Sequence, residues 1–201
     1  MLPELLGLIV CPKCSRPHTR HGILEEDARG GIVDGVVWCE GCRSWYPIVD
    51  GVLELLHEHL AYRDDRATFW QSHAARLEAC GLAPNSGGAA SQLPSAEAKQ
   101  QQHFDWYALN DTQTNNAYER TRFWQAVDTM IFREWRKTIA PGSRLLDVGC
   151  AQGRSLARLM DCDLTVVGFD VSRALVRQAH ARYARGETGA RAAFFVGDAS
   201  R

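Results

Sequence analysis

Four cysteines in the first part of the chain stand in two closely spaced pairs. The pairs are CPKC at 11–14 and CEGC at 39–42, with 24 residues between them. Two cysteines three positions apart in a tight turn can direct both sulfurs to one point, and two such turns supply the four thiolates of a closed tetrahedral zinc site. We therefore predict one structural Zn²⁺ bound by Cys11, Cys14, Cys39 and Cys42.

The same cysteines leave two other interpretations open, a redox-active dithiol and plain buried thiols. His18 and His21 are alternative ligands, but we expect them to be solvated because four cysteines already complete the shell. The chain has seven cysteines in all, and an odd, half-clustered set fits the reducing cytoplasm better than a disulfide framework. The segments between the pairs, HTRHGILEED and GIVDGVVWC, are expected to form a hairpin, and Asp50-Gly51 marks a second hairpin turn.

A glycine-rich stretch follows an apolar run in the last third of the chain. RLLDVGCAQGR, residues 144–154, places Asp147 at the end of an expected buried strand and Gly149, Ala151 and Gly153 in the turn after it. The stretch lacks both the GxGxxG spacing of dinucleotide-binding turns and the Gly-Lys-Ser/Thr of a phosphate loop. Its small residues allow a ligand without a pyrophosphate to approach the backbone, and Ala151 is tolerated if its φ is negative. A nucleotide-binding α/β domain of another kind stays the alternative.

Two further apolar runs predict a parallel sheet with helices between its strands. LTVVGFD at 164–170 ends in Asp170, an acid at a strand tip that can accept both hydroxyls of a ribose. VSRALVRQAHARYA after it has helical spacing, with Ser172 as a candidate N-cap. RAAFFVGDAS at 191–200 is the third expected strand, and the alternation indicates an α/β fold.

The turn after the first of these strands resembles motif I of the class I S-adenosylmethionine-dependent methyltransferases, with Ala in place of the middle Gly. The residues that match are Asp147, Gly149, Ala151 and Gly153. The resemblance implies a Rossmann-like domain that binds S-adenosylmethionine and transfers its sulfonium methyl group to a nucleophile by in-line displacement. No catalytic base and no methyl acceptor follow from the residues present.

The same resemblance assigns cofactor contacts to the ends of all three strands. Asp147 would position the ammonium group, and Asp170 with Val171 would hold the ribose. Asp198 would contact the adenine amino group, and the backbone amide of Ala199 would contact the ring.

The front of the chain resembles the small zinc-ribbon proteins that act as partners and activators of tRNA, rRNA and protein methyltransferases. The match covers residues 2–56 and includes LLGLIVCPKC, WCEGC and WYPIVDGVLELL. It departs in having Val52-Leu53 where the family often has Ile-Pro, and in a long insert between the cysteine pairs. It implies a ribbon that docks on a methyltransferase, and thus a protein partner. Residues 1–60 carry five basic and nine acidic side chains, a net of −4, which disfavours nucleic acid as a partner.

Composition and pattern divide the chain into three expected parts. Residues 1–60 form a zinc-ribbon domain, residues 61–140 a helical linker and cofactor-capping region with a mobile loop at 84–100, and residues 141–201 the first half of a cofactor-binding domain. In the middle part, an apolar stripe with helical spacing is expected to face the core. The stripe consists of Phe123, Val127, Met130, Ile131 and Trp135.

The expected fold is therefore α/β, a methyltransferase half-domain of three parallel strands behind a zinc ribbon. We expect the chain to be truncated after the third strand, which leaves the strand at 144–148 unpaired on one side and the fragment inactive alone. Two alternatives stay open: an RNA (rRNA or tRNA) methyltransferase whose zinc module contacts RNA, and a non-catalytic adaptor for a separate methyltransferase. No apolar stretch approaches the roughly 20 residues of a membrane span, so no membrane association is expected.

Overall fold

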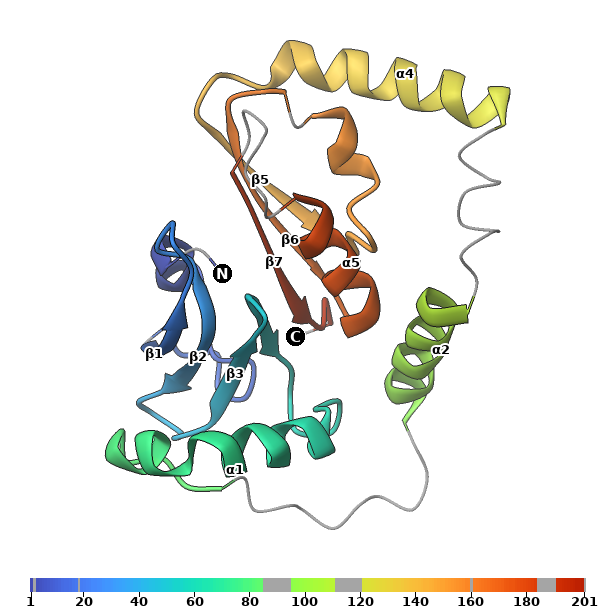
Figure 1. Cartoon of the computed structure of the whole chain (residues 1–201). Helices are drawn as coiled ribbons and strands as arrows, with labels where there is room; N and C mark the ends of the chain where they lie inside the picture. The colour runs from blue at the N-terminus through green and yellow to red at the C-terminus, as the bar shows by residue number, and fades with distance from the viewer. Residues whose placement is uncertain are drawn as a thin grey trace. The chain divides into compact units, whose positions relative to one another are not determined.

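The computed structural model describes residues 1, 3–17, 19–84, 95–110, 121–159, 161–183 and 191–200 (Figure 1). The chain forms two compact units, one of residues 1–100 with 195–201 and one of residues 101–194. His18 and residues 85–94 of the predicted loop lie outside the described residues, and the predicted boundaries at 60 and 140 stay predictions. Within the described part of the chain, no helix is both long enough and apolar enough to cross a membrane.

The first unit contains an antiparallel sheet, preceded by a short 3₁₀ helix, η1 (Pro3–Leu8). The hairpin predicted between the cysteine pairs is confirmed, because β1 (Thr19–Glu26) pairs antiparallel with β2 (Ile32–Cys39). The second predicted hairpin is also confirmed, between β3 (Trp45–Val49) and β4 (Val52–Leu55). Its turn residues Asp50 and Gly51 have φ angles of 52° and 78°, the two positive values that a type I′ turn requires.

Helix α1 (Arg63–Ala79) contributes to the core of the first unit. The rings of Trp45 on β3 and Phe69 on α1 stack with centroids 6.1 Å apart. The buried cluster around them is Val36, Trp38, Trp45, Phe69, Leu77 and Leu82. Residues Phe195–Gly197, which also belong to this unit, pair in parallel with β4.

The second unit contains the predicted strand–helix alternation. Parallel strands β5 (Ser143–Val148) and β6 (Leu164–Asp170) pair in register, and β6 lies between β5 and β7 (Arg191–Gly197), whose first four residues belong to this unit. Helix α5 (Arg173–Tyr183) connects β6 to β7, while the short 3₁₀ helix η2 (Ser155–Arg158) takes the place of the longer helix expected after β5. Helix α4 (Arg122–Thr138) also belongs to this unit, as do residues 101–110 of helix α2 (Ala96–Asn110). Helix α2 begins inside the stretch expected to be a loop up to residue 100.

Strand β5 is less buried than its sequence predicts. The side chains of Leu146 and Val148 are 59% and 55% exposed, although an apolar run of this kind is typical of a strand covered on both faces. In the described part of the chain β5 pairs with β6 alone and ends the strand order. The predicted truncation, from which an unpaired side was expected, stays a prediction. The prediction of a buried strand is wrong, because no described element covers the side chains of Leu146 and Val148.

The apolar stripe predicted to be core lies on the outside of α4. Phe123, Met130 and Trp135 are 67%, 56% and 47% exposed, whereas their neighbour Phe132 is buried. Ile131 is exposed as well, and Val127 is half-buried. The core assignment is therefore wrong.

Polar contacts hold α4 to the segment that follows β5. Asp128 of α4 accepts from Arg154 at 3.1 Å, and Arg136 donates to Asp161 at 2.9 Å. A helix attached through ion pairs and one buried ring leaves its remaining apolar side chains facing outward.

Candidate cofactor site and metal centre

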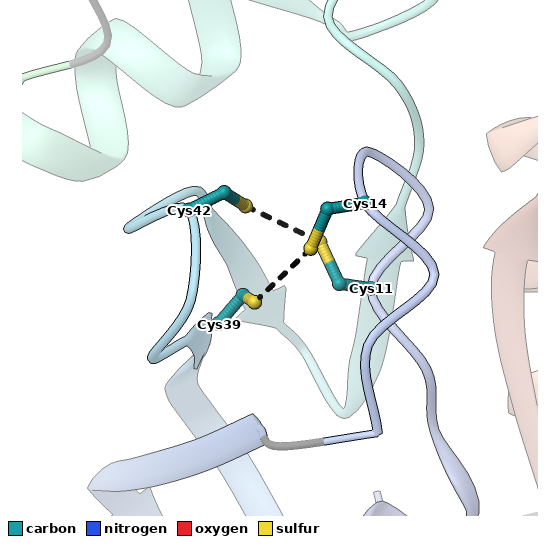
Figure 2. A group of neighbouring side chains, drawn as sticks. All are labelled: Cys11, Cys14, Cys39 and Cys42. Carbon is teal, nitrogen blue, oxygen red and sulfur yellow. Dashed lines mark hydrogen bonds between the residues drawn. The ribbon is translucent and has the colours of Figure 1, made fainter.

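The four predicted cysteine ligands converge on one point of the first unit. Their Sγ atoms all lie within 4.8 Å of one another, and Figure 2 shows them directed toward a common centre. Cys11 and Cys42 approach to 3.6 Å and Cys14 and Cys39 to 3.5 Å. A tetrahedral zinc with Zn–S bonds of about 2.3 Å separates its sulfurs by about 3.8 Å, so the cluster has the dimensions of such a site.

The two cysteine turns share one backbone geometry. The N–H of Ser15 donates to the carbonyl of Cys11 at 2.7 Å, and the N–H of Arg43 donates to the carbonyl of Cys39 at 2.9 Å. Ser15 and Arg43, each the residue after the second cysteine, adopt positive φ angles of 55° and 60°. The CxxC spacing thus folds twice into the same tight turn, and each turn presents two sulfurs on one side.

The local environment favours a thiolate at one of these positions. Burial opposes ionisation of Cys42, but hydrogen bonds from the side chain and backbone of Ser44 and contacts with neighbouring thiols lower its pKa to about 6. Burial raises the pKa of Cys11. All four cysteines are free, and sulfurs 3.5 Å apart are well beyond the roughly 2.05 Å of a disulfide bond. His21 is exposed on β1 and lies outside the cysteine group.

The carboxyl ends of β5 and β6 bring two predicted cofactor acids into one electrostatic environment. Asp170, the last residue of β6, accepts a hydrogen bond from the N–H of Ala151 at 3.1 Å and one from the N–H of Ser172 at 2.9 Å. Its carboxylate thereby links the turn after β5 to the turn after β6. Ligands of open α/β sheets bind at this edge, where the parallel strands end.

Asp147 has a buried carboxylate oxygen that is an unsatisfied hydrogen-bond acceptor among the described residues. Among the described residues, its Oδ2 atom has no hydrogen-bond partner. Burial, and then repulsion by Asp170, raises the pKa of Asp147. Burial also raises the pKa of Cys150, with further contributions from the charges of Asp170 and Asp147. This strand end carries a negative field, which favours a cationic ligand group and disfavours a phosphate.

A small residue stands at each of three positions in the turn after β5, and the structural reason for it differs from one position to the next. Gly149 has a φ of 73°, and a Cβ added there would meet open space. Gly153 has the same φ of 73°, but a Cβ there would lie 2.5 Å from the ring of Tyr183. The condition under which Ala151 would be tolerated without strain, a negative φ, is not met, since its φ is 45°. A left-handed conformation costs a residue with a Cβ about 1–2 kcal/mol, and the hydrogen bond from Ala151 N–H to Asp170 helps to hold it there.

Helix α5 begins as the sequence predicts, with Ser172 as its N-cap. The Ser172 hydroxyl oxygen accepts from the N–H of Leu175 at 3.3 Å. The same hydroxyl donates to Asp105 of α2 at 2.6 Å, and the N–H of Ala174 donates to Asp105 at 3.0 Å. Asp105 therefore caps α5 together with Ser172, from a distant part of the chain.

Helix α2 is attached to the segment that carries the predicted ribose contacts. Gln101 donates from Nε2 to the carbonyl of Val171 at 3.2 Å, and Gln178 of α5 donates to the carbonyl of Ala108 at 3.0 Å. No role was predicted for Asp105 or Gln101 from the sequence. Asp105 lies in the stretch HFDW at 103–106, and no local pattern there specifies a partner 67 residues away.

Two predicted cofactor residues lie in the other unit. Asp198 and Ala199 follow β7 and belong to the first unit, whereas Asp147, Gly149, Ala151, Gly153, Asp170 and Val171 belong to the second. Asp198 accepts from the N–H of Ser200 at 2.9 Å and from its hydroxyl at 2.8 Å. The Asp198 carboxylate therefore shapes the turn that ends β7.

Comparison with known proteins finds similarity to methyltransferases. Residues 145–201 match the sequence model of a family described as a methyltransferase domain. The chain is similar to a SAM-dependent methyltransferase from Geobacter sulfurreducens in complex with S-adenosyl-L-homocysteine, with 31% identity over 36% of this chain and 29% of that one, and a TM-score of 0.32. A TehB-like SAM-dependent methyltransferase from Corynebacterium glutamicum has 25% identity over 44% and 47% of the two chains and a TM-score of 0.31.

A third similar structure is a complex between the Haloferax volcanii Trm112 methyltransferase activator and a methyltransferase. The identity is 25% over 47% of this chain and 38% of that one, with a TM-score of 0.35. No curated protein matches the chain. The chain spans 29%, 47% and 38% of the lengths of these three relatives. The resemblance to the S-adenosylmethionine-dependent methyltransferases is confirmed, and it is residues 145–201 that match the methyltransferase domain.

Proposed function

We propose that this chain is part of a methyltransferase and that the ends of β5 and β6 bind S-adenosylmethionine. The observation that carries the proposal is the buried Oδ2 of Asp147, which lies beside Asp170 at the edge where two parallel strands end and has no hydrogen-bond partner among the residues that the structure describes. An ammonium group supplies both the hydrogen-bond donor and the positive charge that this position lacks. S-adenosylmethionine carries such a group, together with a ribose and an adenine.

The electrostatics of the site separate this cofactor from nucleotides that bind through phosphates. Phosphate sites use helix N-termini and cationic side chains. Here two carboxylates occupy the strand ends, and Arg154 of the turn is paired with Asp128 at 3.1 Å. NAD and ATP would bring further negative charge to this edge, whereas the amino-acid end of S-adenosylmethionine brings a cation.

Each predicted residue has a proposed role. Asp147 holds the ammonium group, Asp170 with Val171 holds the ribose, and the turn made of Gly149, Ala151 and Gly153 lies under the ligand. Asp198 contacts the adenine amino group and Ala199 contacts the ring, on the basis of the family resemblance alone. When bound, the cofactor supplies an electrophilic methyl group for transfer to a nucleophile. The chain's own residues bind and orient, which is the main source of catalysis when no proton transfer is required.

Calorimetry with wild type and two matched variants tests this assignment. Wild type should bind S-adenosylhomocysteine in preference to NAD and ATP. Asp170→Ala removes a charged hydrogen-bond acceptor, a loss of about 1.5–3 kcal/mol, and should weaken binding roughly 10- to 150-fold. Asp163→Ala is the control, because Asp163 is an exposed acid directly before the opposite end of the same strand. Equal affinity of wild type and Asp170→Ala would refute the placement.

We further propose that the cysteine cluster binds one structural zinc ion and that this zinc module contacts a protein. The sulfur separations fit the shell, and a module of this size gains much of its folding energy from the metal. The net charge of −4 over residues 1–60 disfavours contact with RNA phosphates. The resemblance to methyltransferase activators makes a methyltransferase domain the proposed partner.

A further inference from the structure

A tyrosine lies directly against the cysteine cluster. The hydroxyl of Tyr46, on β3, is 3.2 Å from Sγ of Cys11. Both side chains are shielded from water, with Tyr46 2% and Cys11 0% exposed. A buried hydroxyl needs a hydrogen-bond partner, and the sulfur is the partner that the fold provides.

The chemistry of a metal-bound cysteine fixes the direction of this bond. A thiolate that ligates zinc has no proton, so its sulfur can only accept and the tyrosine hydroxyl must donate. This argument rests on the proposed zinc site. A donor aimed at a ligating sulfur orients that ligand and neutralises part of its charge, as the outer partners of metal ligands commonly do.

A buried ion pair fixes the position of the tyrosine ring. The guanidinium carbon of Arg66, on α1, lies 5.7 Å from the ring centroid of Tyr46. Arg66 donates from Nε to Glu54 of β4 at 2.7 Å and from a terminal nitrogen to the carbonyl of Leu56 at 3.2 Å. The side chains of Arg66 and Glu54 are 5% and 6% exposed, so the pair is fully inside the first unit.

The cation above the ring has two effects on the hydroxyl. It holds the ring by cation–π attraction, which is stronger where water is excluded. It also withdraws electron density from the ring, which makes the hydroxyl a better donor. These contacts form a chain of four side chains. Glu54 contacts Arg66, Arg66 lies over the ring of Tyr46, and the Tyr46 hydroxyl contacts the sulfur of Cys11.

We propose that Tyr46 is a positioning residue of the metal centre, whose hydroxyl donates to the Cys11 thiolate and is held in place by Arg66 and Glu54. The bond makes the Cys11 arm of the site more rigid and its sulfur less basic. The ordered ligand and the stabilised negative charge on its sulfur both oppose loss of the metal ion to a competing chelator. No pattern in the sequence marks this role, because Tyr46 is 35 residues from Cys11 along the chain.

Cobalt substitution of the full chain tests the proposal. Co²⁺ replaces zinc in tetrahedral thiolate sites and reports on each sulfur through its thiolate-to-cobalt charge-transfer bands. Tyr46→Phe removes only the hydroxyl, so these bands should move to longer wavelength and Co²⁺ affinity, measured by chelator competition, should fall about 10- to 100-fold. Tyr183→Phe is the matched control, because it deletes another buried hydroxyl bond, to the Gly153 carbonyl at 2.7 Å in the other unit, and should leave the bands unchanged.

The outcomes separate this inference from the zinc assignment. Wild type that gives no tetrahedral thiolate spectrum would overturn the zinc site and this inference with it. Wild type that binds Co²⁺, with Tyr46→Phe showing the same bands and affinity, would overturn the inference alone. If Tyr46→Phe fails to fold, 3-fluorotyrosine at position 46 replaces it. This residue keeps the hydroxyl and makes it a stronger donor, so the bands should shift to shorter wavelength, and unchanged bands would again overturn the proposal.

Discussion

The substitution Gly153→Ala should destabilise the second unit through two separate effects. The φ of Gly153 is 73°, where a residue with a Cβ loses about 1–2 kcal/mol. The added methyl group would lie 2.5 Å from Cε2 and 3.1 Å from Cδ2 of Tyr183, and crowding of a packed site typically costs about 1–3 kcal/mol. The ring of Tyr183 is held by the hydrogen bond from its hydroxyl to the Gly153 carbonyl. It also packs against Phe194, with the two ring centroids 5.9 Å apart. We expect a total loss of about 2–5 kcal/mol.

Gly149→Ala separates the backbone effect from the crowding effect. Gly149 has the same φ of 73°, but its Cβ position has no atom within 4 Å. Only the backbone cost of about 1–2 kcal/mol should appear. Urea unfolding followed by hydrogen exchange in peptides from α5 reports on the second unit alone, because α5 lies wholly within it.

A third variant tests whether Tyr183 causes the difference. In a Tyr183→Ala background the ring is gone, so Gly153→Ala should cost only about 1–2 kcal/mol, the same as Gly149→Ala. Equal destabilisation by Gly149→Ala and Gly153→Ala in the native background would refute the crowding argument. So would a Gly153→Ala cost that stays the same after Tyr183 is removed.

Three further outcomes follow from the described residues. Elemental analysis should find one zinc per chain in wild type and a loss of zinc with a lower melting temperature in Cys39→Ser, whereas full zinc at unchanged stability would contradict the ligand assignment. Leu146→Lys combined with Val148→Lys should reduce self-association in sedimentation velocity, because both side chains are exposed on a strand with one paired neighbour, and an unchanged distribution would exclude this surface. Phe132→Ala should lower the free energy of unfolding by about 3–5 kcal/mol in urea unfolding, because Phe132 is buried, and Met130→Ala should lower it by only about 0.5 kcal/mol, because Met130 is 56% exposed. The reverse order of the two losses would show that α4 packs through its other face.

The cysteine turns and hairpins were predictable because their chemistry is local. Asp50-Gly51 has the backbone preference that a type I′ turn needs, and both residues adopt the required positive φ. Each cysteine turn is likewise closed by a hydrogen bond within the turn, from Ser15 to Cys11 and from Arg43 to Cys39. The hairpin of β1 and β2 then pairs Thr19 with Cys39, which brings the end of the first cysteine turn next to the start of the second. Convergence of four sulfurs therefore needs only contacts between neighbouring segments.

The burial of α4 and β5 was not predictable from their own residues. Helical spacing of Phe123, Met130 and Trp135 shows that one face of the helix is apolar, but it carries no information about what covers that face. The attachment of α4 depends instead on ion pairs with residues more than 20 positions away. In the same way, an apolar run at 145–148 predicts a strand and cannot specify how many neighbours that strand has.

The cofactor site was predictable from the sequence only in part. Acids at the ends of two parallel strands follow from strand pattern alone, and the structure places Asp170 close enough to Asp147 to contribute to the raised pKa of Asp147. The positive φ of Ala151 and the contact of Asp105 with Ser172 do not follow, because each depends on a partner from another element. The acids that would contact a ligand were predictable from the sequence, whereas the residue that attaches α2 to the start of α5 was not.

The turn after β5 also shows why glycines alone do not identify a ligand. In a phosphate-binding turn the backbone N–H groups point at the anion, and a long helix behind them adds its dipole. Here the N–H of Ala151 is already used by Asp170, and the element that follows is the four-residue 3₁₀ helix η2, which has no comparable dipole. Two carboxylates, one of them with a buried oxygen that lacks a donor within the described residues, then determine the sign of the field. The chemistry that this turn can accept is therefore set by the acids on either side of it, and a cationic amino-acid group meets that requirement where a pyrophosphate does not.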